Sequence, residues 1–305
     1  MRIGIMSGHG RQDEGVEALI TKARDLEARG FPSLWFGNIF AIDAMTAIAL
    51  IGRETRTIEL GTAVVPTFPR HPTVMAQQAL TAQSTCGGRF TLGIGLSHQI
   101  VIESLFGLSY ERRVSHMREY LEVLQPLLRG DAADFDGEEY RVHVSTPVPD
   151  SQPVSVVIAA LGPKMLALAG ERTDGTSLWM TGPKTVEDFV KPTLDAAAKE
   201  AGRPEPRIIS GLPVALTSDE AEGRARISEL MNAYNTIPSY RGVLDREGAA
   251  QPGDVAIVGD EKRLGEQLDR LRDAGVTDLN AAIIPIDDGA DARTLDFLES
   301  RLAGD

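Results

Sequence analysis

Short apolar runs alternate along the chain with longer stretches in which apolar residues recur at helical spacing. Residues 14–29 place their apolar side chains on one helical face, and Gly30 follows where a helix-ending glycine is expected. Residues 112–129 and 261–274 show the same spacing. The apolar runs are short enough to be strands, and they comprise 2–6, 33–37, 57–64, 89–95, 155–159, 176–180, 207–215 and 279–285.

Most of these strands are separated from the next by one predicted helix. Such alternation predicts right-handed βαβ units and a parallel sheet. Eight units in a chain of 305 residues favour a (β/α)8 TIM barrel over an open doubly wound sheet. The first strand also lacks the G-x-G-x-x-G motif that opens a helix in dinucleotide-binding sheets. Because no linker or repeat is evident, we expect one α/β domain over residues 1–305.

Three stretches exceed the minimal strand–helix repeat. Residues 97–111 are predicted to form a long loop after strand 4, and residues 130–153 a further excursion with a small hairpin. Residues 237–256 are predicted to be an insertion between helices 7 and 8, which span 218–236 and 261–274. Long connections in a compact domain are usually functional or disordered.

Composition and charge narrow the class of protein. Hydrophobic residues make up 42% of the chain and charged residues 25%, as in ordinary soluble globular proteins. The net charge of −13 repels phosphodiester backbones, so we expect no nucleic-acid partner. The single cysteine, Cys86, excludes an intrachain disulfide and fits a reducing compartment. Neither a secretory signal nor an apolar run of membrane-spanning length is seen, so a cytoplasmic location without membrane contact is expected.

The active site of such barrels is built from the loops at the carboxyl ends of the strands. One of these loops has a specific physical interpretation, because Gly162 and Pro163 stand where a helix begins and Lys164 follows. Free N–H groups at a helix start bind anions, and a lysine adds positive charge. A phosphate site and a plain helix start explain these residues equally well. The candidate loops are 7–10, 38–40, 66–72, 95–99, 161–164 and 181–184.

Four segments carry a likeness to a known family. They are LGTAVVPTFPRHPTVMAQQALTAQ at 60–83, GGRFTLGIGLSHQ at 87–99, GPKMLALAGERTDGTSLW at 162–179, and the C-terminal helix that ends in DAGV. With them the chain resembles the bacterial luciferase-like superfamily, the flavin- and deazaflavin-dependent oxidoreductases with a (β/α)8 barrel. The GTAV stretch resembles the branch that uses coenzyme F-420, a 5-deazaflavin.

This resemblance implies a cofactor site at named positions. In the branch, a non-prolyl cis peptide in the third strand supports the deazaflavin ring, and its position here would be Ala63–Val64. Asn38 would lie near the polar edge of the ring, and Thr67 and Ser97 would hydrogen-bond ring or ribityl atoms. The phosphate would lie on the loop 162–165. The full implied cofactor set is Asn38, Ala63, Val64, Thr67, Gly95, Ser97, Gly162, Pro163, Lys164, Met165 and Thr181.

Proton transfer is assigned to the loop after the fourth strand. His98 can donate or accept a proton near neutral pH, although a structural role in the loop is as well supported. Ser97 is the candidate for orienting the substrate. The sugar-phosphate dehydrogenases of the family have a histidine where Ile39 stands and a glutamate where His98 stands, so glucose-6-phosphate is not expected as the substrate.

Three further residues are candidates for substrate contact. His9 lies in the turn after the first strand, and Tyr240 and Arg241 lie in a segment that either covers the substrate or anchors a loop. The five histidines are scattered and form no H-x-H or H-E-x-x-H pair, so no metal site is expected.

The function expected from these features is hydride transfer between coenzyme F-420 and an unidentified small organic substrate. The first alternative is an FMN-dependent luciferase-like monooxygenase, and the second is a non-catalytic subunit that binds a flavin or deazaflavin. Basic residues near the phosphate, such as Lys164 and Lys184, favour coenzyme F-420 because it carries an additional acidic tail. The resemblance also implies a homodimer, and a flavin or deazaflavin reductase as a partner that supplies reduced cofactor.

Overall fold

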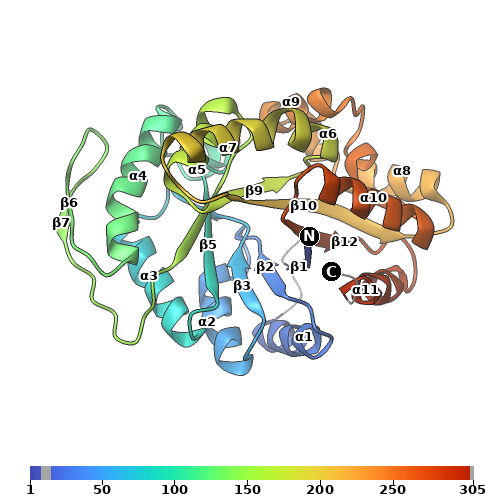
Figure 1. Ribbon diagram of the computed structural model, residues 1–305, viewed down its shortest axis with the longest axis horizontal. Helices are drawn as coiled ribbons and strands as arrows, with labels where there is room; N and C mark the ends of the chain where they lie inside the picture. The colour runs from blue at the N-terminus through green and yellow to red at the C-terminus, as the bar shows by residue number, and fades with distance from the viewer. Residues whose placement is uncertain (8–14, 303–305) are drawn as a thin grey trace.

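Eight parallel strands close into a barrel at the centre of the molecule (Figure 1). The computed structural model describes residues 1–7 and 15–302. Strand β10 pairs with β9 on one side and with β12 on the other, which closes the ring and confirms the predicted TIM barrel. In spatial order the strands are β1 (Arg2–Ser7), β2 (Ser33–Phe36), β3 (Glu59–Thr62), β5 (Phe90–Gly95), β8 (Ser155–Ala159), β9 (Gly175–Trp179), β10 (Arg207–Leu216) and β12 (Asp278–Ile283).

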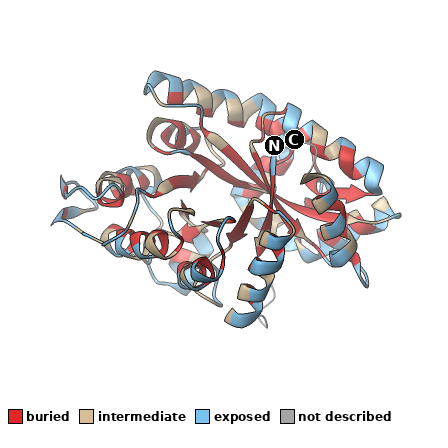
Figure 2. Ribbon diagram, turned by 60° about the horizontal axis from the view of Figure 1, so that its bottom comes forward, coloured by how far each residue is buried: buried red, intermediate tan, exposed pale blue. Residues whose placement is uncertain are grey.

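Helices cover the outside of the barrel and bury their apolar faces against it. Figure 2 shows the strands as largely buried and the outer helix surfaces as exposed. In α10 the buried Leu264, Leu268 and Leu271 repeat at helical spacing, as the sequence predicts. The main helices are α1 (Val16–Ala28), α2 (Ala44–Glu54), α3 (Pro72–Thr85), α4 (Arg113–Leu128), α5 (Pro163–Arg172), α7 (Lys191–Glu200), α8 (Glu220–Leu230), α10 (Glu261–Asp273) and α11 (Ala290–Ser300).

The three long connections all contain regular structure. After β5, residues Ile100–Leu105 form a short π-helix. The excursion after α4 is a hairpin of β6 (Ala133–Asp136) and β7 (Arg141–Val144), as predicted. The remaining short elements are β4 (Val65–Pro66), α6 (Pro183–Thr185), a π-helical turn Val186–Val190, 3-10 turns at Asn232–Thr236 and Pro252–Val255, and β11 (Ile257–Gly259).

The predicted insertion 237–256 lies between α8 and α10, and it is more regular than a long loop. Most of it is helix α9 (Pro238–Glu247). Pro238 occupies the first helical position, and Gly248 ends the helix with a positive φ of 83°. The buried residues Tyr240, Val243 and Leu244 form a narrow stripe that fixes α9 to the barrel mouth.

An ionic cluster closes the amino-terminal end of the barrel. Arg207 donates to Glu59 at 2.8 Å and to Asp278 at 2.7 Å, and Arg2 contacts Glu59 at 2.7 Å. Each of these residues is the first of its strand. Burial alone would raise the pKa of Glu59, but the hydrogen bonds and charge of Arg207 hold it below its ordinary value. Because this end is filled, a ligand has to enter from the carboxyl ends of the strands.

Among the helices of residues 1–7 and 15–302, none has the length and apolar character needed to cross a membrane.

Candidate active site

The third barrel strand is interrupted by a bulge at the carboxyl end of the barrel. The Ala63–Val64 peptide bond is cis, as the resemblance implied, and it separates β3 from β4. Val64 packs over β5, where two glycines make room for it. A Cβ on Gly95 would lie 2.6 Å from Val64 Cγ2, and a Cβ on Gly93 would overlap the carbonyl oxygen of Thr62. The G-I-G stretch of β5 is therefore required for close packing of the bulge.

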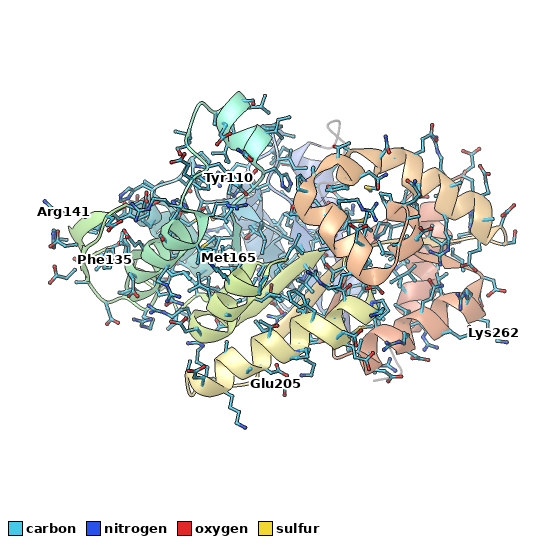
Figure 3. The ribbon with its side chains drawn as sticks, turned by 90° about the horizontal axis from the view of Figure 1, so that it is seen from above. Tyr110, Phe135, Arg141, Met165, Glu205 and Lys262 are labelled. Carbon is cyan, nitrogen blue, oxygen red and sulfur yellow. The ribbon has the colours of Figure 1, made fainter. Side chains whose placement is uncertain are left out.

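The loop after β5 is held in a defined conformation. Ser97 has a positive φ of 61°, and its carbonyl oxygen accepts a hydrogen bond of 2.8 Å from the Tyr110 hydroxyl. The next carbonyl, that of His98, accepts from the backbone N–H groups of Val101 and Ile102. In Figure 3 the segment that follows β5 stands out from the body of the molecule, with Tyr110 at its base.

His98 is half-buried at this end of the barrel. Burial lowers the pKa of its imidazole below the ordinary value of 6.5. The ring is therefore neutral at neutral pH and can accept a proton. This arrangement is compatible with the proton-transfer role predicted from the sequence.

His98 belongs to a row of four rings that we call the aromatic wall: His98, Tyr240, Tyr234 and Trp179. The ring centroids of His98 and Tyr240 are 5.5 Å apart, those of Tyr240 and Tyr234 are 4.8 Å apart, and those of Tyr234 and Trp179 are 6.1 Å apart. All three contacts are edge-to-face. Tyr234 was not predicted from the sequence, because only the fold brings its short 3-10 turn beside β9 and α9.

Two loops with the sequence Gly-Pro-Lys begin helices at this end, and they differ in what faces them. At α6, the Glu247 carboxylate accepts from the backbone N–H groups of Lys184 (3.0 Å) and Thr185 (2.7 Å). The Lys184 ammonium is also paired, with Asp188 at 2.5 Å. This helix end is already occupied by an anionic group of the protein itself.

The start of α5 is open by comparison. Gly162 is the N-cap, and within the described part of the chain no side chain caps this helix end. A Cβ on Gly162 would meet nothing within 4 Å. Lys164 is exposed, whereas Met165 is buried and fixes the first turn. Open N–H groups beside a lysine suit an anion, so this geometry is compatible with a phosphate at the loop.

Three residues predicted to contact a cofactor are engaged elsewhere. Thr67 is fully buried, and its hydroxyl lies 2.9 Å from His116 Nε2. Thr181 is also buried, and its hydroxyl donates to the Trp179 carbonyl. The Asn38 side-chain oxygen accepts from the Ala44 N–H at the start of α2. These contacts support structural roles for Thr67 and Thr181, and the contact of Asn38 leaves its amide nitrogen available to a ligand.

The remaining substrate candidates separate in the structure. Tyr240 lies in the aromatic wall, but Arg241 points away from it. The Arg241 guanidinium donates to the carbonyl oxygens of Ala249 (2.6 Å) and Ala250 (3.0 Å), so it anchors the connection after α9. His9 lies outside the residues that the structure describes.

His116 has a larger structural role than its helical position predicts. It is buried beneath the hairpin, stacks on Phe68 with centroids 4.0 Å apart, and connects Thr67 to the Tyr140 hydroxyl. Burial lowers the pKa of His116 to about 4, although the charge of Glu119 opposes the shift. This contact fixes the proline-rich loop 66–72 to α4 and to the hairpin.

Comparison with known proteins agrees with this geometry. Residues 1–278 match the model of the luciferase-like monooxygenase family. The chain is 29% identical over 236 residues to a 5,10-methylenetetrahydromethanopterin reductase of Archaeoglobus fulgidus, which covers 76% of this chain and 70% of that relative.

Two solved structures share the fold over nearly the whole chain. One is a coenzyme F-420-dependent tetrahydromethanopterin reductase from Methanopyrus kandleri, with a TM-score of 0.83 at 21% identity over 99% of this chain and 98% of that one. The other is the oxygenating constituent of 3,6-diketocamphane monooxygenase from Pseudomonas putida in complex with FMN, with a TM-score of 0.79 at 17% identity over 99% and 98%.

Proposed function

Because the chain belongs to the luciferase-like monooxygenase family, we propose that it is an oxidoreductase that transfers a hydride between coenzyme F-420 and a small organic substrate. The observation that carries this proposal is the open start of α5 beside Lys164, next to a second Gly-Pro-Lys loop that Glu247 already caps. The relative from Archaeoglobus fulgidus, itself named as a reductase, supports hydride chemistry.

The residues present fit such a cofactor at two points. The open backbone N–H groups of Lys164 and Met165 and the Lys164 ammonium suit its phosphate. The bulge at Val64, packed on Gly93 and Gly95, offers a firm apolar support for a flat ring system.

The residues of the chain would bind the coenzyme, orient the substrate and move a proton. When bound, coenzyme F-420 supplies a ring carbon that accepts or delivers a hydride. The neutral His98 imidazole would take the proton from a substrate hydroxyl as its carbon is oxidised, and would return it to the oxygen in the reverse direction. Ser97, held by Tyr110, would orient the substrate beside it.

The proposal is tested by titrating the purified protein with coenzyme F-420 and with FMN and following fluorescence. Tight binding of coenzyme F-420 with weak binding of FMN is the expected result. Preference for FMN would support the monooxygenase alternative, to which the fold likeness to the FMN-bound diketocamphane enzyme also points. Binding without redox turnover of any substrate would support the non-catalytic subunit.

The chain offers a matched pair of variants for the phosphate site. Lys164→Ala should weaken coenzyme binding by about fivefold, the effect of losing one exposed ion pair of about 1 kcal/mol. Lys184→Ala should leave it unchanged, because Lys184 is paired with Asp188 and its helix start is capped by Glu247. Equal effects of the two substitutions would contradict the assignment of the phosphate to α5.

A further inference from the structure

The aromatic wall carries information about the substrate, because it presents rings and little charge. The charged groups near it are satisfied within the protein. Arg241 is bound to Asp245 and to two carbonyl oxygens, and Glu247 caps α6. An anionic substrate would therefore find no free cation along the wall among the described residues.

Two uncharged polar groups lie side by side on this wall. Within the part of the chain that the structure describes, no group accepts a hydrogen bond from the Tyr240 hydroxyl, and none bonds the His98 ring nitrogens. Burial raises the pKa of the Tyr240 phenol far above its ordinary value, so the hydroxyl stays protonated and remains a donor. Burial also keeps His98 neutral. A donor and a proton acceptor are thus available to one neutral oxygen function.

Apolar side chains continue from the wall to the rim of the same barrel end. Phe40, after β2, meets Phe106, after β5, in an edge-to-face contact with centroids 6.0 Å apart. Ile100 follows His98 by two residues and is 66% exposed, and Phe40 is 59% exposed. An exposed apolar rim beside the aromatic wall suits the approach of an apolar molecule.

We propose that the substrate is uncharged, with a flat aromatic body and one carbonyl or hydroxyl oxygen. The body packs against Tyr234 and Trp179, and the oxygen accepts a hydrogen bond from Tyr240 beside His98. Tyr240 and Tyr234 are then the residues that determine specificity. This inference rests on the proposed function, because it describes the substrate of the same site.

The test uses four small probes and the full-length protein, with and without coenzyme F-420, in isothermal titration calorimetry. The probes are 2-acetylnaphthalene, its carboxylate counterpart 2-naphthoate, the non-aromatic cyclohexyl methyl ketone, and 2-ethylnaphthalene, which lacks the oxygen. We expect 2-acetylnaphthalene to bind about tenfold more tightly than 2-naphthoate or the cyclohexyl ketone, since 2-naphthoate brings a charge without a cationic partner and the cyclohexyl ketone lacks the ring contacts. Equal or tighter binding of 2-naphthoate would overturn the proposal.

Two substitutions test the hydrogen bond and the ring contact of the wall separately. Tyr240→Phe removes only the hydroxyl and should weaken 2-acetylnaphthalene binding about fivefold, while leaving 2-ethylnaphthalene unchanged. Tyr234→Leu should weaken both naphthyl probes, and thermal unfolding checks that this variant is folded. Tyr140→Phe, on the hairpin, is the control and should change neither. Unchanged ketone binding by the Tyr240→Phe variant would refute the role of Tyr240. The probes are also measured without coenzyme. A failure of the substrate proposal can therefore be distinguished from a failure of coenzyme binding.

Discussion

Acid should destabilise this protein through His116. The imidazole is only 5% exposed and lies between Phe68, Thr67 and Tyr140 beneath the hairpin. Its pKa is lowered to about 4 by burial, whereas in the unfolded chain it has the ordinary value of 6.5. Between these two values the unfolded state binds more protons than the folded state. The contribution of the neutral His116 to the free energy of unfolding is therefore fully present above pH 6.5, and it is lost as the pH falls toward 4.

The size of the effect follows from the two pKa values. Between pH 7 and pH 5 the shift in His116 corresponds to a loss of about 2 kcal/mol in the free energy of unfolding. For a chain of 305 residues this amounts to a decrease of about 3 °C in the melting temperature. Many carboxylates also begin to titrate in this range, so the contribution of one histidine has to be measured as a difference between variants.

The assay is urea unfolding at pH 7 and at pH 5 for the wild type and for His116→Gln, which keeps a hydrogen-bonding side chain but cannot take up the proton. The wild type should lose about 2 kcal/mol more than this variant on acidification. His143→Gln should retain the full acid loss, because His143 is exposed and its pKa is raised by Asp134. An identical acid loss for wild type and His116→Gln would refute the burial argument.

Three other outcomes are expected. Gly95→Ala should destabilise the protein by about 1–3 kcal/mol in urea unfolding and should weaken coenzyme binding, because the new Cβ would lie 2.6 Å from Val64. Unchanged stability would mean that the bulge can shift. Arg207→Met should cost about 3 kcal/mol or more, since Asp278 would remain as a buried charge with one partner fewer, and a melting temperature like that of the wild type would contradict this. With an identified alcohol substrate, kcat/KM should fall on acidification through a pKa below 6.5, and His98→Gln should remove this pH dependence. If the His98→Gln variant still loses kcat/KM on acidification, His98 is excluded as the base.

The barrel was predictable because its strands are encoded locally. All eight predicted runs became barrel strands, with every boundary within two residues, and β3 is shorter than predicted at both ends. There the predicted run 57–64 ends in the bulge, and regular pairing stops at Thr62. The cis bond at Ala63–Val64 was anticipated only through the family resemblance, because nothing in the local sequence specifies it.

The site was less predictable because it is assembled from distant segments. Tyr234 and Trp179 are far apart in the chain, and neither shows in the sequence that it faces the other. The family resemblance implies cofactor contact for Thr67, yet the helix that carries His116 takes up its hydroxyl. Helix α9 carried the start and stop signals Pro238 and Gly248, but its narrow apolar stripe was too weak to be recognised.

The ionic cluster beneath the barrel ties together positions at both ends of the chain. Arg2 opens the first strand and Asp278 opens the last, with Glu59 and Arg207 between them. During synthesis, a nascent chain that has not yet released β12 lacks one of the two carboxylates that Arg207 requires. A guanidinium with one partner missing is costly to bury. The floor of the barrel is therefore complete only when its first and last strands are both in place, so neither end of the barrel can be removed without leaving part of this cluster unpaired.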